Sequence, residues 1–248
     1  MNTISLRARY LNNRREHQHE MLSLPPKRTA LLLVDVYLGE QYGEDIEGVT
    51  GSKVTPWWDA MHRCKDILDA ARSIPLPIVY VMNSSPRIAL NHSAWGRHFK
   101  RSWDADFDRA FREGGVDPRE YHSGRPGPLQ IPPGLEPMEG EYYIRKHVYS
   151  GFFDSRLDTL LRNLRIESVV MAGMWADVCM LTTAYDAFYR NYEVIWVRDG
   201  TMSGLDPAPD GSMPATEQVA DTVEWAIGYT TTSAEFTAAC LSCGSGAE

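Results

Sequence analysis

A cysteine lies at a position where its thiol could act as a nucleophile. Cys179 ends the segment 173–179, which follows the apolar run 168–172 and precedes a helical pattern over Met180–Arg190. A thiol in the first turn of a helix meets unpaired backbone N–H groups and the positive end of the helix dipole, and both favour the thiolate. The same N–H groups can stabilise an oxyanion. The pattern therefore predicts a strand-to-helix turn that carries a nucleophilic cysteine.

Two charged residues occupy matching positions at the ends of other predicted strands. Asp35 follows the apolar run 30–34, and Lys146 follows the run 142–145. In open α/β sheets the functional site lies beyond the carboxyl ends of the strands, so we expect Asp35, Lys146 and Cys179 to meet there. Asp35 would accept the thiol proton and pass it to a leaving amine, while Lys146 would keep Asp35 ionised. The alternatives are a strand-end cap, a solvated lysine and a buried structural cysteine.

Strand and helix patterns alternate along most of the chain. Apolar spacing predicts helices between six short strands. The predicted strands are Thr29–Val36, Pro77–Met82, Tyr142–Lys146, Ser168–Gly173, Val194–Val197 and Tyr229–Thr232. The alternation predicts an α/β fold with a doubly wound, mostly parallel six-stranded sheet and helices on both faces.

Two segments depart from this alternation. Residues 1–28 are polar and predict an N-terminal arm, either partly ordered or packed on a neighbouring subunit, ahead of a hydrolase domain over 29–248. Residues 84–140 are rich in proline, glycine and charge, and predict a lid-like insertion or a subunit contact. We expect the arm or the insertion to contribute to a homo-oligomer, a dimer or a tetramer.

The composition limits the class of protein. With 248 residues, of which 43% are hydrophobic, the chain can form one large α/β domain. Its net charge of −8 argues against non-specific nucleic-acid binding. The chain has neither an apolar run of membrane-spanning length nor the apolar core of a secretory signal, and its four cysteines are too few for a disulfide framework. We expect a cytoplasmic protein without nucleic-acid or membrane partners.

Two stretches of the sequence resemble a known family. The stretches Lys146–Asp154 and Gly173–Asp199 resemble the isochorismatase-like cysteine hydrolases, and the resemblance extends from about Thr29 to the C-terminus. The pattern Lys-x-x-Tyr-Ser-Gly-Phe-Phe is most similar to the ureidoacrylate amidohydrolase branch, with the biuret hydrolases close by.

The resemblance implies roles for particular residues. Asp35, Lys146 and Cys179 would form a catalytic triad. The peptide bond between Met174 and Trp175 would be cis, and the backbone N–H groups of Trp175 and Cys179 would form the oxyanion hole.

The sequence also departs from the family near the reacting centre. The usual Asp-x-Gln motif after the first strand ends in Tyr37 here, and the nucleophile turn carries Trp175 and Asp177 where the ureidoacrylate branch has Ala and Asn. The reaction type therefore carries over, but the identity of the substrate does not.

Six residues are candidates for contact with the substrate. They are Tyr37, Arg87, Tyr149, Phe152, Trp175 and Asp177. The aromatic side chains could instead pack in the core, and Arg87 could be solvated. Asp177 is either a helix cap or an acceptor for an N–H-rich substrate group such as a terminal ureido end.

No cofactor or metal site is expected. Nicotinamidases of this superfamily carry an Asp-x-His motif and a later His after the second strand, whereas His92 and His98 lie further along the chain here. Cys240 and Cys243 lack two further zinc ligands nearby and are interpreted as tail thiols. The chain has neither a glycine-rich phosphate loop nor a dinucleotide-binding fingerprint.

These observations predict a metal-independent cysteine amidohydrolase that cleaves a C–N bond of a small ureido, carbamoyl or amide substrate through a thioester. Two alternatives remain. One is a non-catalytic member of the family that binds a ligand or a protein. The other is a vinyl ether hydrolase of the isochorismatase type.

Overall fold

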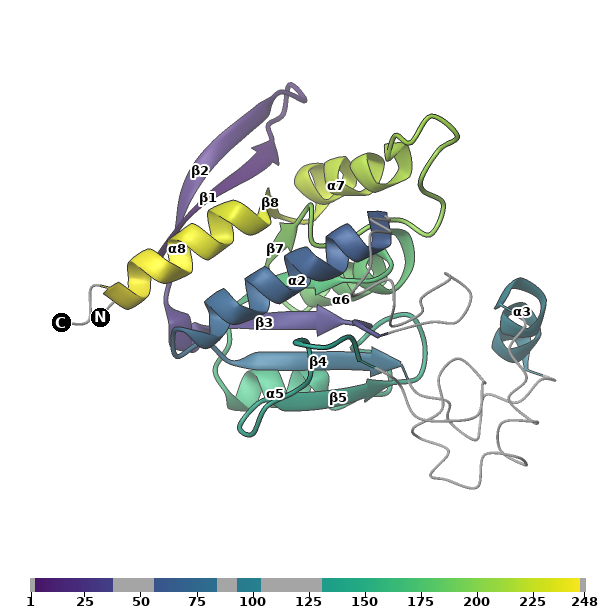
Figure 1. Ribbon diagram of the computed structural model, residues 1–248, viewed down its shortest axis with the longest axis horizontal. Helices are drawn as coiled ribbons and strands as arrows, with labels where there is room; N and C mark the ends of the chain where they lie inside the picture. The colour runs from purple at the N-terminus through teal and green to yellow at the C-terminus, as the bar shows by residue number, and fades with distance from the viewer. Residues whose placement is uncertain (1–2, 38–55, 84–92, 104–130, 246–248) are drawn as a thin grey trace.

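The protein folds around one eight-stranded sheet, seen in a computed structural model that describes residues 3–37, 56–83, 93–103 and 131–245 (Figure 1). The strand order is β2-β1-β8-β7-β6-β3-β4-β5. The strands are β1 (Ile4–Leu11), β2 (His17–Leu24), β3 (Thr29–Val34), β4 (Ile78–Asn83), β5 (Tyr142–Lys146), β6 (Ser168–Gly173), β7 (Glu193–Val197) and β8 (Tyr229–Thr231). The helices are η1 (Pro26–Arg28), α2 (Pro56–Arg72), α3 (Ala94–Trp103), α5 (Leu157–Asn163), η4 (Ala176–Met180), α6 (Leu181–Tyr189), α7 (Pro214–Ala226) and α8 (Ser233–Ser245).

The strands from β3 to β8 form the parallel part of the sheet. Each neighbouring pair among them runs in the same direction, and helical segments connect many of them. The predicted α/β class, with a doubly wound and mostly parallel sheet, is therefore confirmed.

The predicted number of six strands is wrong, because residues 1–28 contain two more. β1 and β2 form an antiparallel hairpin, and β1 also pairs with β8 antiparallel. β1 buries Ile4, Leu6 and Ala8 and exposes the residues between them, as expected of a strand with one face on a core. Polar residues on the exposed face, Arg7 among them, make the mean hydropathy of the segment polar. This mean obscured the alternation of apolar and polar residues that is typical of a strand.

Helices cover both faces of the sheet with separate apolar cores. Leu31 and Leu33 of β3 join the core under α2 and α8, whereas Ala30, Leu32 and Val34 join the core under α5, α6 and α7. Figure 1 shows α2 and α8 on the near side of the sheet, with α5 and α6 behind it. Both faces of β3 are buried, so its side chains form the continuous apolar run seen in the sequence.

The C-terminal segment is a helix and not a tail. α8 buries Phe236, Cys240 and Cys243 against the core that it shares with α2. The interpretation of Cys240 and Cys243 as tail thiols is therefore wrong. Cysteine packs as a small hydrophobic residue, which explains its use on this helix face.

Two predictions concern regions that the structure describes only in part. Of the predicted insertion 84–140, residues 93–103 and 131–140 lie within the described ranges, so the lid stays a prediction. The division into an arm and a domain, and the homo-oligomer, also stay predictions. None of the helices within the described residues combines the length and the apolar character that a membrane span needs.

The end of β6 approaches the neighbouring strand β3 very closely. Gly173 ends β6 with φ at +126°, and a Cβ atom built on it would lie 1.9 Å from the carbonyl oxygen of Val34. The backbone N–H of Met174 donates to that same oxygen at 2.8 Å. Only glycine combines this dihedral angle with this close approach, which fixes the following turn beside the end of β3.

We predict that Gly173→Ala destabilises the fold by more than about 3 kcal/mol or prevents folding, because a backbone clash adds to the dihedral strain. Gly211→Ala is the matched control. Gly211 also has a positive φ, +81°, but nothing lies within 4 Å of its added Cβ. We expect that variant to lose only about 1 kcal/mol. Urea denaturation measures both changes, and equal losses would contradict the steric explanation.

Candidate active site

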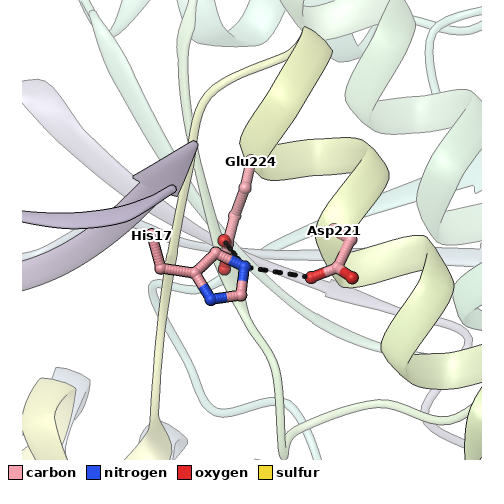
Figure 2. A group of neighbouring side chains, drawn as sticks. All are labelled: His17, Asp221 and Glu224. Atoms are coloured by element: carbon pink, nitrogen blue, oxygen red, sulfur yellow. Dashed lines mark ion pairs between the residues drawn. The ribbon is translucent and has the colours of Figure 1, made fainter. Parts of the chain in front are cut away.

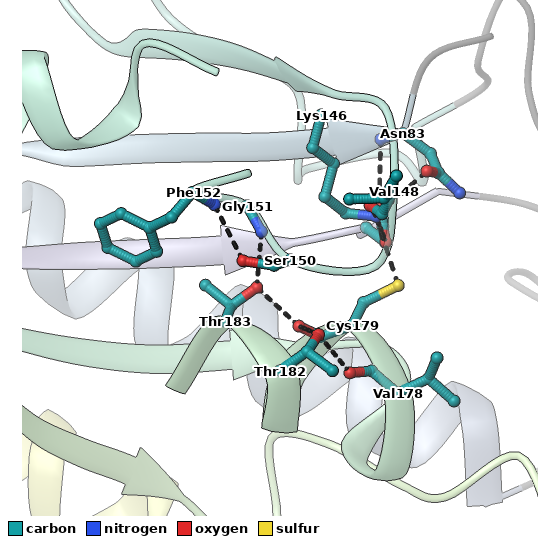
Figure 3. Close-up of polar contacts among 11 residues, drawn as sticks. Asn83, Lys146, Val148, Ser150, Gly151, Phe152, Val178, Cys179, Thr182 and Thr183 are labelled. Carbon is teal, nitrogen blue, oxygen red and sulfur yellow. Dashed lines mark hydrogen bonds and ion pairs between the residues drawn. The ribbon is translucent and has the colours of Figure 1, made fainter. Parts of the chain in front are cut away.

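The structure brings together the three side chains that the sequence places at strand ends. Lys146 Nζ lies 2.7 Å from Asp35 Oδ2. It also lies 3.2 Å from Cys179 Sγ (Figure 3). The side chain of Lys146 is 0% exposed and that of Asp35 is 4% exposed. The ammonium therefore links the carboxylate and the thiol in a site that excludes bulk water.

The parallel strands β3, β4 and β5 determine this arrangement. Asp35 directly follows β3, and Lys146 ends β5 on the other side of β4. Asn83 ends β4 between them. Its backbone N–H donates to Asp35 Oδ1 at 2.8 Å, and its side-chain oxygen accepts from Lys146 Nζ at 3.1 Å. Sequence analysis missed this role of Asn83, although its position at a strand end on the same edge was a usable signal.

Cys179 lies in the short segment between β6 and α6. The peptide bond between Met174 and Trp175 is cis, as expected. The segment then forms η4, a single π-helical turn that buries Cys179 before α6 begins. Such turns often occur at functional sites.

A threonine on α6 holds the nucleophile turn against the segment that follows β5. Thr183 Oγ1 donates to the carbonyl oxygen of Cys179 at 2.6 Å and accepts the backbone N–H of Gly151 at 2.9 Å. Lys146 Nζ also donates to the carbonyl oxygen of Val148 at 3.3 Å. The residues after β5 are therefore bonded to both the ammonium and the nucleophile turn.

Burial and charge set the protonation states of the site. Burial raises the pKa of the Cys179 thiol to about 12, because the opposing effect of Lys146 is smaller and Asp35 adds to the rise. Burial lowers the pKa of Lys146, but Asp35 and Cys179 raise it, and the balance lies above its ordinary value. Burial therefore favours the protonated thiol, and the adjacent Asp35 carboxylate favours the charged ammonium. Burial of Cys179 opposes the thiolate that the helix N-terminus and Lys146 favour, so the ionisation of this thiol stays a prediction.

The aromatic substrate candidates lie in different environments. Tyr37 is half-buried against the core under α2 and α8. Tyr149 Oη lies 3.1 Å from His98 Nε2 and so contacts α3. Phe152 is buried in the core, 6.0 Å between ring centroids from Tyr192, and Figure 3 shows it directed away from Cys179. Phe152 therefore fits the core-packing alternative. Arg87, the only charged candidate besides Asp177, lies outside the described residues.

Trp175 and Asp177 connect the nucleophile turn to the loop that follows β7. The Trp175 indole packs partly against the core, and a Cβ atom built on Gly204 would lie 3.8 Å from it. Asp177 Oδ2 accepts the hydroxyl of Ser203 at 2.8 Å, and Oδ1 accepts the backbone N–H of Gly204 at 3.2 Å. η4 has no side-chain cap hydrogen bond, so Asp177 is not a helix cap. Both of its oxygens serve to attach this loop to the turn.

We predict that Asp177→Ala lowers the free energy of unfolding by about 1–2 kcal/mol, because the buried Ser203 hydroxyl loses its acceptor. Asp177→Asn should lower the free energy of unfolding much less. Its amide oxygen can accept from Gly204, and its amide NH₂ can donate to Ser203 Oγ. Urea denaturation of the two variants checks this role, and an unchanged stability of Asp177→Ala would contradict it.

Comparison with known proteins places the chain in a family. Residues 29–234 match the family model described as the isochorismatase domain. A ureidoacrylate amidohydrolase RutB of Rhizobium rhizogenes is 28% identical over 206 residues, which cover 73% of each chain. One from Cronobacter sakazakii is 27% identical over 229 residues, which cover 84% of each chain.

Solved structures show the same fold. The cysteine hydrolase from Pseudomonas syringae pv. phaseolicola 1448A superposes with a TM-score of 0.63 at 22% identity, covering 89% of this chain and 95% of the other. The N-carbamoylsarcosine amidase from Thermoplasma acidophilum superposes with a TM-score of 0.56 at 26% identity. The match covers 83% of this chain and 96% of the other. With most of its length matched by the family model, the chain belongs to the isochorismatase family.

Proposed function

We propose that the protein is a metal-independent cysteine amidohydrolase that cleaves a non-peptide C–N bond in a small molecule. The observation that carries this proposal is the position of Lys146 Nζ, which contacts Asp35 Oδ2 and Cys179 Sγ in a buried site. The names of the relatives, amidohydrolase, amidase and cysteine hydrolase, support the same reaction class.

Acylation begins with the protonated thiol. As Cys179 Sγ attacks the substrate carbonyl carbon, its proton passes to the Asp35 carboxylate, and the carbonyl oxygen becomes an oxyanion. Backbone N–H groups of Trp175 and Cys179 would stabilise that oxyanion. Transfer to Asp35 during the attack avoids a free thiolate, whose formation burial opposes. Lys146 remains charged throughout and offsets the negative charge that develops on sulfur.

Cleavage of the C–N bond then needs a proton on nitrogen. Asp35 returns the proton to the departing amine, which leaves a thioester on Cys179 and an ionised Asp35. A water molecule loses a proton to Asp35 as it attacks the thioester, and collapse of that intermediate breaks the C–S bond. The proton on Asp35 passes to the departing sulfur, so the thiol and the carboxylate are restored.

The favoured substrates are compact ureido or carbamoyl compounds. Ureidoacrylate and N-carbamoylsarcosine, which appear in the names of the relatives, share a carbamoyl group on nitrogen. Trp175 replaces a small residue at the nucleophile turn, which favours a planar substrate of limited size. Both carboxylate oxygens of Asp177 accept hydrogen bonds from Ser203 and Gly204, so Asp177 is not proposed to select a ureido end.

We predict that the protein releases ammonia from at least one compound among ureidoacrylate, biuret, N-carbamoyl amino acids, maleamate and nicotinamide. Cys179→Ser should lower that rate at least about 1,000-fold with the fold intact, since serine is a far weaker nucleophile here. Cys64→Ser is the matched control, because Cys64 is a buried thiol whose Sγ donates to the carbonyl oxygen of Gly200, a contact that a hydroxyl can keep. Ammonia release by Cys179→Ser at the wild-type rate would refute the mechanism. If none of these compounds releases ammonia, the non-catalytic alternative is favoured.

We also predict the pH dependence of alkylation at Cys179 in the absence of substrate. A thiol pKa raised to about 12 means that the thiolate fraction grows about tenfold per pH unit between pH 7 and 10. The rate of carbamidomethylation by iodoacetamide should therefore still be rising at pH 10. Mass mapping of the modified peptide follows Cys179 alone, with Cys179→Ala as the blank. A rate that levels off below pH 8 would instead show a thiol that is already ionised in the resting site.

A further inference from the structure

A buried glutamate on α7 has one carboxylate oxygen without a hydrogen bond. The side chain of Glu224 is 0% exposed. Its Oε1 accepts from Arg9 Nε at 2.6 Å and from the hydroxyl of Thr230. Its Oε2 has no hydrogen-bond partner among the described residues and lies 3.5 Å from His17 Nε2. A buried carboxylate oxygen of this kind is costly unless something else contacts it.

His17 and Asp221 complete a group of three ligand atoms around that oxygen. His17 begins β2, and Asp221 lies one helical turn before Glu224 on α7, so the two carboxylates share a helix face. His17 Nε2 is 3.5 Å from Glu224 Oε2 and 3.5 Å from Asp221 Oδ1 (Figure 2). The three ligand atoms lie within 4.8 Å of one another.

The separations suit a shared cation better than they suit hydrogen bonds. A nitrogen with one proton or one lone pair can bond only one of two equidistant oxygens, and 3.5 Å exceeds the usual length of such a bond. Two ligands on a tetrahedral zinc ion, each about 2.0–2.2 Å from the metal, lie about 3.3–3.6 Å apart. We propose that His17, Asp221 and Glu224 bind a divalent first-row metal ion, zinc in the first instance, between the N-terminal hairpin and α7.

The charges of the group accommodate a divalent ion. The two carboxylates carry two negative charges, whereas Arg9 supplies one positive charge. Arg9 bonds Glu224 through Oε1, so Oε2 faces His17. Neutral imidazole and carboxylate are common zinc ligands, and three protein ligands leave a fourth position for water. The metal would join β2 to α7 and act on stability, separately from the chemistry proposed at Cys179.

The test is a zinc titration of the EDTA-treated, dialysed full-length protein by isothermal calorimetry. We expect one equivalent to bind, and a melting temperature raised by about 5 °C at a free zinc concentration of 100 times Kd. His17→Ala and Asp221→Asn should each weaken zinc binding at least about 10-fold and remove the rise in melting temperature. Both side chains are substantially exposed, so these variants keep the buried contacts of Glu224 and should fold.

Matched controls separate this site from other zinc ligands. His62→Ala removes an exposed histidine on α2, and Glu217→Gln removes an exposed carboxylate on α7. Both should bind zinc as the wild type does, and so should Cys179→Ala, which lacks the thiol of the candidate active site. Absence of saturable zinc binding, or equal affinity in His17→Ala and the wild type, would overturn the proposal and leave the group as ion pairs that attach the hairpin to α7.

Discussion

The buried ion pair between Asp35 and Lys146 is the interaction on which the arrangement of the site depends. Removing both charges from water is costly, and the pair is stable only if further hydrogen bonds satisfy each group. Asn83, Val148 and Cys179 supply these contacts. Each comes from a segment near the same edge of the sheet, so the strand order must be correct before the pair can form.

The same ion pair would let a buried thiol react in the proposed mechanism. Burial favours the protonated form of Cys179, and the adjacent carboxylate is placed to accept its proton during the attack. Lys146 would then offset the negative charge that develops on sulfur. The proposed chemistry relies on proton transfer within this group of side chains more than on the dipole of α6, whose first turn is preceded by the π-helical η4.

Much of the sheet and the three central side chains could be predicted from the sequence. The buried strand β3 produces an apolar run that Asp35 directly follows, and the shorter strand β5 ends at Lys146, which made both positions visible. Asn83 ends β4 in the same way, but an asparagine after an apolar run has no chemical signature of its own.

Other contacts could not be predicted because they join segments far apart in the chain. Asp177 bonds Ser203, which lies 26 residues away in a loop without a recognisable pattern. Phe152 packs near Tyr192, which lies in the turn between α6 and β7, 40 residues further along the chain. The hairpin of β1 and β2 was missed because its apolar residues are few, and α8 because its buried face uses small residues such as Cys240 and Cys243.

The two-sided burial of β3 has an evolutionary consequence. Its consecutive residues, such as Leu32 and Leu33, belong to different cores, and Asp35 directly follows the strand. Inserting or deleting one residue within Thr29–Val34 would move every later side chain to the opposite face and shift Asp35 from Lys146. Exchange of one aliphatic side chain for another of similar volume changes neither core assignment nor register. Descendants of this sequence can therefore vary in this strand by substitution, whereas changes in length are tolerated only in the loops outside it.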